Sequence, residues 1–289
     1  MIGELEIDSS TERVGDGVHA LSLSARWGLD DGRLNGGYQL AVALRALAAE
    51  VPMPDPVVAS ATFLRPAMPG TARVLTEVVR ACRRLATGTA RLVQAGRDGV
   101  ERDVLRLEAT FADLAASQAD PHDLTSPPAL PPFERCRMFG GDDAPATAAP
   151  VSRRVRFAAP ELPGWARGAP SGDPRAEFWF AFADGSDATL LDLAFVVDGA
   201  APVVLDLGRG SSTVQLTVHL RERPAPGPLR CRTVTQHLAH GLHEEDVEVC
   251  DAAGALVAQS RAAGAAALRR APTSSTGPAP PAGARRARR

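Results

Sequence analysis

The sequence predicts an α+β protein of two similar units, each with one buried helix followed by antiparallel strands. Three observations support this prediction. Residues 38–50 are apolar on nearly every side of a helix, which is typical of a helix buried in a core. Residues 213–221 alternate strictly between polar and apolar side chains, as a half-buried strand does. Short motifs of the first unit recur in the second at a nearly constant distance along the chain.

The first unit is expected to begin its helix after Asn35-Gly36-Gly37, with Leu40, Leu44 and Leu47 along one face. Prolines at positions 52, 54 and 56 end this helix, because proline cannot continue one. Four strand-like runs follow, and we expect strands at residues 57–64, 72–80, 87–95 and 104–112.

In the second unit, Asp187 is predicted as the N-cap of an apolar helix over residues 188–197. The alternating strand comes next, and further strands are expected at residues 229–238, 242–251 and 255–262. Because strands and helices do not alternate regularly along the chain, a doubly wound parallel sheet is disfavoured.

The two units correspond to each other through matching motifs. Arg65-Pro66 and Gly70 in the first unit match Arg223-Pro224 and Gly227 in the second, within a stretch where the offset is 156 to 158 residues. We therefore predict an N-terminal domain (1–118), a proline-rich linker (119–150), a C-terminal domain (151–270) and a disordered tail (271–289).

Composition excludes several classes of protein. All 32 Lys+Arg residues are arginine, so a P-loop lysine and a Schiff-base lysine are both absent. The net charge of −2 does not favour a nucleic-acid partner, and no apolar run is long enough to cross a membrane. The four scattered cysteines indicate reduced thiols, and we expect a cytoplasmic protein.

Two groups of motifs resemble one known family. Trp27, Asn35-Gly36-Gly37-Tyr38 and Phe63-Leu64-Arg65-Pro66 are similar to the first half of the acyl-CoA thioesterase II-like (TesB-like) proteins, and residues 213–219 and 254–261 are similar to the second half. The resemblance covers most of residues 20–268. It implies a double hot-dog fold, in which each sheet wraps around a long central helix. It also implies hydrolysis of fatty acyl-CoA thioesters, a step of lipid metabolism, without a metal or organic cofactor.

The resemblance also suggests catalytic residues. In the family, an Asp on a second-half strand activates water, helped by a Ser or Thr and by a Gln. The Asp position falls on Gln215, which orients water but cannot take its proton. The Ser/Thr position falls at or beside Thr235, and the Gln position falls near Ala262. Some enzymes of this fold place a carboxylate on the central helix, and Asp192 is that candidate, with a solvated helix edge as the alternative.

The start of the first helix is the candidate substrate-binding loop. In Asn35-Gly36-Gly37-Tyr38 the glycines allow close approach of a ligand, and a helix start offers free N–H groups. A tight turn that packs the helix on the sheet explains the loop equally well. His219 faces the same side as Gln215 and is a candidate base or substrate contact, with a cross-strand polar pair as the alternative.

Three functions follow from these predictions. The first is an acyl-CoA thioesterase, and the second is an acyl-CoA or acyl-carrier binding module that has lost its base. The third is a dehydratase of the same fold, which would need a His/Asp pair that we cannot place. No metal site is predicted, because His237, His240 and His243 alternate faces on a strand. A homo-oligomer is compatible with the sequence.

Overall fold

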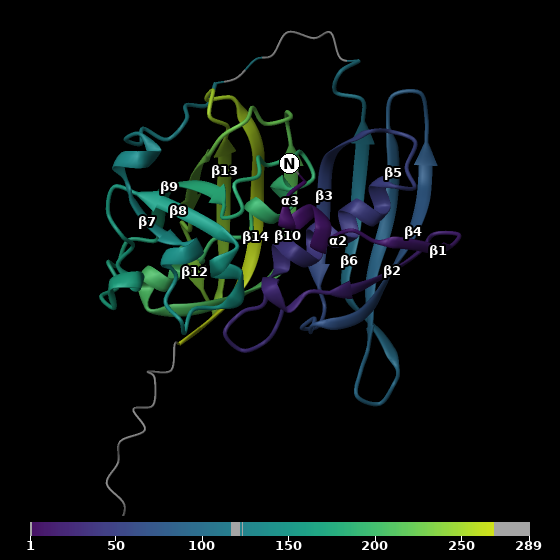
Figure 1. Ribbon diagram of the computed structural model, residues 1–289, viewed down its shortest axis with the longest axis horizontal. Helices are drawn as coiled ribbons and strands as arrows, with labels where there is room; N and C mark the ends of the chain where they lie inside the picture. Colours follow the sequence, from purple (N-terminus) through teal and green to yellow (C-terminus); the bar gives the residue numbers. More distant parts are fainter. Residues whose placement is uncertain (1, 117–121, 123, 269–289) are drawn as a thin grey trace, which may run out of the picture.

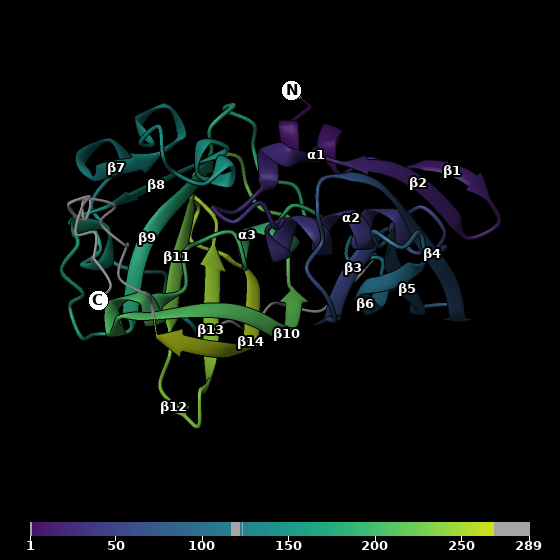
Figure 2. The same cartoon turned by 90° about the horizontal axis from the view of Figure 1, so that it is seen from below.

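The computed structural model describes residues 2–116, 122 and 124–268, and its strands form one antiparallel sheet of 14 strands. Figures 1 and 2 show the sheet curving through the whole molecule, with the helices near its middle. The strand order is β1-β2-β4-β5-β6-β3-β10-β14-β13-β11-β9-β8-β7, and β12 pairs with β13 off this path. The six strands of the first half therefore meet the strands of the second half where β3 lies beside β10.

The first half contains six strands and two α-helices. The strands are β1 (Glu12–Gly15), β2 (Val18–Leu23), β3 (Asp55–Phe63), β4 (Gly70–Ala81), β5 (Ala86–Ala95) and β6 (Glu101–Ala112). The helices are α1 (Glu4–Asp8) and α2 (Gly36–Ala48), with a 3-10 turn, η1 (Ala25–Trp27), between β2 and α2. All four strands predicted for this half are confirmed, and β1 and β2 are additional.

The second half contains eight strands and one short α-helix. The strands are β7 (Arg137–Gly140), β8 (Val155–Ala159), β9 (Arg175–Phe182), β10 (Arg209–Leu220), β11 (Leu229–Val234), β12 (Leu238–Ala239), β13 (Leu242–Cys250) and β14 (Leu256–Leu268). The helix is α3 (Leu193–Val196), and the 3-10 turns are η2 (Phe133–Arg135), η3 (Gly141–Asp143), η4 (Pro150–Arg153), η5 (Trp165–Arg167) and η6 (Val203–Leu207).

The two halves repeat one strand order about the β3–β10 pair. Outward from this pair the first half runs β6-β5-β4-β2 and the second runs β14-β13-β11-β9. Ser60 pairs with Thr217 across the junction, and their hydroxyl oxygens are 3.0 Å apart. The strand register also gives the spacing of the repeat. Ala90 pairs with Leu107 in the first half, and the residues 155 positions later, Glu245 and Ala262, pair with each other in the second half. The predicted internal repeat is confirmed.

The helices match the prediction in the first half only. Helix α2 is buried along most of its length, and its N-cap is Asn35, whose Oδ1 accepts from Tyr38 N at 3.0 Å. The second helix is four residues long, not ten, and begins after Asp192. Asp187 is not its N-cap: its Oδ1 accepts from Gly227 N at 2.8 Å. The apolar run therefore predicted the start of this helix wrongly, because tertiary contacts rather than local spacing set where it begins.

The proline-rich range 119–150 is also more ordered than predicted. Residues 119–121 and 123 lie outside the described residues, and so does the predicted tail, 271–289. From residue 133 onward the chain forms η2, β7 and η3, and β7 pairs with β8 at the edge of the sheet. The end of the predicted linker therefore belongs to the second half.

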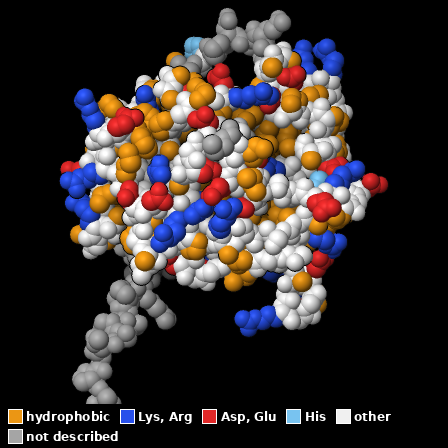
Figure 3. Space-filling model, viewed as in Figure 1, with side chains coloured by type: hydrophobic (Ala, Val, Ile, Leu, Met, Phe, Trp, Pro, Cys, Tyr) orange, Lys and Arg blue, Asp and Glu red, His pale blue; other side chains and the backbone are white. Residues whose placement is uncertain are grey.

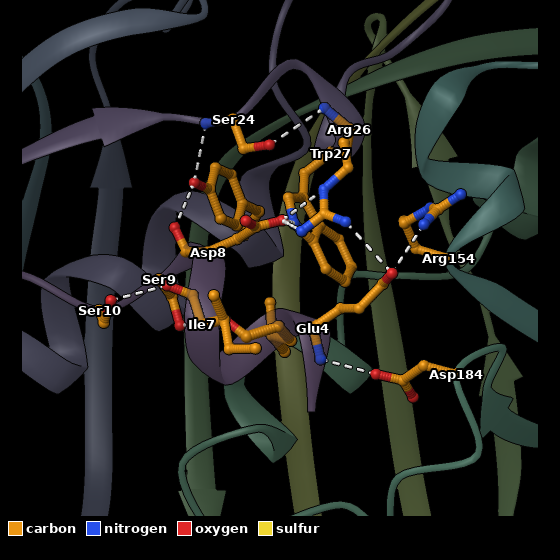
Figure 4. Close-up of polar contacts among 12 residues, drawn as sticks. Glu4, Ile7, Asp8, Ser9, Ser10, Ser24, Arg26, Trp27, Arg154 and Asp184 are labelled. Atoms are coloured by element: carbon orange, nitrogen blue, oxygen red, sulfur yellow. Dashed lines mark hydrogen bonds and ion pairs between the residues drawn. The ribbon is translucent and has the colours of Figure 1, made fainter. Parts of the chain in front are cut away.

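The N-terminal segment fixes the chain that leads into α2 (Figure 4). Asp8 accepts from Trp27 Nε1 at 2.8 Å through its carboxylate and from the Tyr38 hydroxyl at 2.8 Å through its carbonyl oxygen. Burial raises the pKa of Tyr38 to about 12. Glu4 pairs with Arg26 in the first half and with Arg154 in the second. These contacts hold the start of α2 in one position relative to both halves.

The face of the molecule seen in Figure 3 shows no segregated charge, and the described residues form no membrane-spanning helix. Acidic and basic side chains are interspersed over the face in Figure 3. No helix within residues 2–116, 122 and 124–268 is long and apolar enough to cross a membrane.

Candidate active site

The start of α2 lies directly against the end of α3. A Cβ at Gly36 would lie 2.5 Å from Asp198 Oδ2, and one at Gly37 would lie 2.7 Å from the carbonyl oxygen of Phe195. Asn35 also donates from Nδ2 to the Asp198 carbonyl oxygen at 3.1 Å. Only glycines allow this approach, so residues of the two halves meet at the N-terminus of α2.

Asp198 is the acidic side chain at this meeting point. Its Oδ1 accepts a hydrogen bond from Thr213 Oγ1 at 3.0 Å. Burial raises the pKa of Asp198 to about 6, although the hydrogen bonds from Thr213 and from the Gly37 backbone N–H act in the opposite direction. A carboxylate with a pKa of about 6 is largely ionised at neutral pH and is basic enough to take a proton.

A β-bulge in β10 brings Thr213 to this side of the sheet. Thr213 pairs with Gly264 and Gln215 pairs with Ala263, so Val214 is an extra residue in the ladder. Without the bulge, Thr213 and Gln215 would face the same side. With it, Thr213 joins the inner face, where Leu216 is fully buried, and Gln215 is exposed on the outer face.

A second carboxyl, that of Glu245 on β13, lies close to Asp198. Its Oε2 accepts from the backbone N–H of Val203 in η6 at 2.8 Å. Burial raises the pKa of Glu245 to about 7, and the negative charge of Asp198 raises it further. Two carboxyls with raised pKa values on one inner face are an arrangement that proteins use for acid–base chemistry.

A buried histidine extends the same polar face. His243 Nε2 is 2.8 Å from Ser211 Oγ on β10, although strand β14 lies between them. Gly264 makes this contact possible, because a Cβ there would overlap the His243 ring and lie 2.8 Å from Ser211 Oγ. His243 Nδ1 is 3.2 Å from the Glu244 carbonyl oxygen and 3.5 Å from Thr235 Oγ1.

The residues predicted from the sequence are divided among several places. Asn35, Gly36, Gly37 and Tyr38 form the helix start at the site, with Tyr38 bonded to Asp8 and to Ser24 N. Thr235 is buried next to His243. The structure does not bring Gln215, His219 or Asp192 to the Asp198 carboxylate.

Gln215 and His219 are both exposed on the outer face of β10. Burial against the sheet and the charge of Arg221 lower the pKa of His219. Asp192 is buried, but its carboxylate pairs with Arg45 of α2 and accepts from Thr189 N at 2.8 Å and Thr189 Oγ1 at 2.7 Å. These bonds make Asp192 a link between the two helices.

Sequence reasoning missed Asp198 and Glu245. The available signal for Asp198 is its position at the end of the apolar run 193–197, directly before Gly199, where the chain must leave the core. Glu245 offers no such signal, since it follows Glu244 in a polar stretch that reads as a solvated strand face.

The described residues contain no group of three or more His, Cys, Asp and Glu side chains able to hold a metal ion. A surface hollow of about 500 Å³ lies away from Asp198 and is lined by Leu64, Arg65, Arg102, Asp103 and Arg106. The chemistry available at the candidate site is therefore that of carboxyls, hydroxyls, an imidazole and backbone N–H groups.

Solved structures with the same arrangement define the fold. A protein with a hot-dog fold from Alicyclobacillus acidocaldarius superposes with a TM-score of 0.77 at 18% identity, over 92% of this chain and 98% of its own. Acyl-CoA thioesterase II TesB2 from Mycobacterium marinum superposes with a TM-score of 0.67 at 16% identity, over 92% and 98% of the two chains. The chain has a hot-dog fold.

Sequence matches define the family. Residues 23–112 match the acyl-CoA thioesterase N-terminal domain, and residues 121–265 match the acyl-CoA thioesterase C-terminal domain. A proposed thioesterase II from Thermobifida fusca YX is 30% identical and superposes with a TM-score of 0.81, over 92% of this chain and 98% of its own. An uncharacterized protein of Mycobacterium tuberculosis H37Rv is 27% identical over 250 residues, 79% of this chain and 84% of its own. The chain belongs to the TesB-like acyl-CoA thioesterase family, as its motifs predicted.

Proposed function

We propose that this protein hydrolyses fatty acyl-CoA thioesters with a water molecule that Asp198 deprotonates, without a metal. One observation supports this proposal above the others: a half-buried carboxylate, whose pKa is raised to about 6, lies at the start of α2 and accepts a hydrogen bond from Thr213. The base that the sequence does not offer at Gln215 is thus available from the chain that follows α3. No binding-only function is needed to explain the position of Gln215.

The proposed reaction has two steps. Asp198 takes a proton from water, whose oxygen bonds to the thioester carbonyl carbon and gives a tetrahedral oxyanion. The first N–H groups of a helix have no acceptor within the helix. In α2, Tyr38 N–H donates to Asn35 and Gly37 N–H donates to Asp198, which leaves the N–H of Gly36. Gly36 N–H is then the donor for the oxyanion. The carbon–sulfur bond breaks in the second step, the fatty acid leaves, and the CoA thiolate gains a proton.

We also infer that the chain is a double hot-dog in which both halves contribute to one site. The repeated strand order on the two sides of the β3–β10 pair supports this inference, and so does the packing of α2 against α3. The first half supplies the helix start, and the second supplies Asp198 and Thr213. The substrate of such a site would lie between the halves.

Asp198→Asn tests the proposal. The amide is the same size as the carboxyl and cannot accept a proton, so kcat on fatty acyl-CoA should fall about 1000-fold while substrate binding persists. Steady-state hydrolysis and calorimetric binding of acyl-CoA measure the two effects. Asp187→Asn is the matched control, because Asp187 accepts from a backbone N–H elsewhere in the second half.

Two outcomes would contradict the proposal. Undiminished turnover in Asp198→Asn would exclude this base, and acyl-CoA binding without turnover in the wild type would favour the binding module. Gln215→Asp separates the sequence prediction from the structural one. Because Gln215 is exposed on the outer face, its change to Asp should not raise activity.

A further inference from the structure

The inner faces of the two halves differ at one pair of equivalent positions. In the first half, Ala90 on β5 is paired with Leu107 on β6, and both are buried. In the second half, the equivalent pair is Glu245 on β13 and Ala262 on β14. The alanine of the pair is on β5 in the first half but on β14 in the second, so the space over Ala262 is available to the longer side chain of Glu245.

The contacts of Glu245 leave one carboxyl oxygen unused. Oε2 accepts from Val203 N at 2.8 Å, and no described residue donates a hydrogen bond to Oε1. The carboxyl is also near enough to Asp198 for the two charges to interact. A half-buried carboxyl with one oxygen that accepts no hydrogen bond from the described residues differs from a fully paired buried acid such as Asp192, which binds Arg45 and Thr189.

We propose that Glu245 is the general acid of the site, which donates its proton to the sulfur of the departing CoA while Asp198 acts as the base. This inference rests on the proposed thioesterase function and deepens it. It assigns opposite protonation states to the two carboxyls, which is expected of neighbouring acids, because two such charges cannot both be formed easily in a buried site.

The protons balance over one turnover. Water gives a proton to Asp198 and its oxygen bonds to the carbonyl carbon. When the carbon–sulfur bond breaks, the sulfur takes the electron pair and the proton of Glu245, and CoA leaves as a thiol. The fatty acid is released, and the proton on Asp198 passes to Glu245, which restores the starting state.

The surroundings of Glu245 agree with a neutral acid. On the side of the sheet that Glu245 faces, the titratable and charged groups are Asp198 after α3, Asp206 on η6 and His243 on β13, with the Asp192–Arg45 pair between α3 and α2. The other charged groups of β13 and of its partner strands β11 and β14 alternate onto the opposite face: Glu244, Asp246, Glu248, Arg230, Arg232 and Arg261. Arg45 is already paired with Asp192, and His243 with Ser211. None of these groups is hydrogen-bonded to Glu245 within the described residues, so a proton on Glu245 is its simplest neutralisation.

The pH dependence follows from the pKa values of the two acids. Asp198, with a pKa of about 6, must be ionised, so activity rises as the pH increases through that value. Glu245, with a pKa of about 7, must be protonated, so activity falls as the pH increases beyond it. The expected profile of kcat/KM is bell-shaped, and only its alkaline side belongs to Glu245.

The test compares two leaving groups in the full-length protein. Glu245→Gln preserves the size of the side chain and an oxygen that accepts from Val203 N, but its amide has no acidic proton to transfer to the leaving sulfur. We expect it to lower kcat/KM about 100-fold on S-acyl pantetheine, whose alkyl thiolate needs a proton. On the S-acyl thionitrobenzoate ester, whose aryl thiolate leaves unaided, the loss should be below about fivefold. The alkaline side of the pH profile should disappear.

Glu244→Gln is the matched control, since Glu244 is the adjacent residue and accepts from Gln236 N and His237 N instead. It should leave both substrates unaffected. Equal losses on the two esters would make Glu245 structural and overturn the inference, and so would an unchanged rate on both. Failure of the inference alone would appear as a wild type that hydrolyses acyl-CoA, an inactive Asp198→Asn and an active Glu245→Gln. A wild type without turnover on any ester would overturn both proposals.

Discussion

The two halves of the molecule share one strand order, but the helices that cover their strands differ in length. In the first half, α2 runs for 13 residues over the sheet, and Leu47 near its end packs on Gly88, where a Cβ would lie 2.8 Å from the leucine side chain. In the second half, α3 has only four residues. The equivalent of Gly88 is His243, 155 residues later, and it reaches across β14 to Ser211.

This difference shows how a repeated unit can divide its roles. The long helix gives the first half an apolar interior, and the start of that helix contributes N–H groups to the site. The short helix leaves part of the second sheet uncovered by α-helix, and η6 with the polar side chains of Ser211, Thr213, His243 and Glu245 occupies that space. The proposed acid and base, Glu245 and Asp198, therefore both belong to the second half.

The difference between the two interiors is tested most strongly by placing a carboxyl in the first half. Ala90→Glu places an acid at the position equivalent to Glu245, but beneath α2 and among apolar side chains. We expect the free energy of unfolding to fall by about 4 kcal/mol, because the buried group has no partner. Urea denaturation measures this loss.

Ala95→Glu, at the exposed end of the same strand, should change that free energy by less than about 1 kcal/mol. Equal effects of the two substitutions would show that the interior of the first half accepts an acid as readily as that of the second.

Gly264→Ala tests the contact across β14. The added Cβ overlaps the His243 ring, so the Ser211–His243 hydrogen bond must break and the strands must shift. We expect a loss of about 2 kcal/mol in the free energy of unfolding by chemical denaturation. The equivalent residue in the first half is Ala109, and Ala109→Gly should cost about 1 kcal/mol through backbone entropy alone. An unchanged stability in Gly264→Ala would contradict the contact.

Thr213→Val has the smallest expected effect and probes the bulge. Loss of the hydrogen bond to the Asp198 carboxylate should raise the pKa of Asp198 by about one unit above its value in the native protein. A smaller fraction of Asp198 is then ionised at neutral pH, so the acid side of the activity profile moves to higher pH and activity recovers at alkaline pH. Thr217→Val, on the outer face of the same strand, should leave the profile unchanged. A shift in both variants would refute the assignment of faces.

Much of the fold follows from local patterns. The apolar helix, the strand-like runs and the repeated motifs predicted α2, the central strands and the duplication, because side-chain periodicity is a property of neighbouring residues. Strands β7, β8 and β9 escaped prediction. Strands β7 and β8 have only four and five residues, too few for a clear alternation pattern, and all three strands are held by pairing along the chain of strands β7-β8-β9-β11.

The candidate site, like the fold, was only partly predictable from local sequence patterns. The sequence by itself determined the helix start at Asn35-Gly36-Gly37, the thioesterase family and the absence of lysine chemistry. Only the tertiary structure placed Asp198 at the start of α2 and turned Glu245 to the same side of the sheet as Thr213 and His243. One extra residue, Val214, turns Thr213 inward and Gln215 outward, and no alternation pattern reveals it. Asp198 and Glu245 are distant along the chain, and their pKa values are raised because folding removes both carboxyls from water, with a further rise for Glu245 from the charge of Asp198.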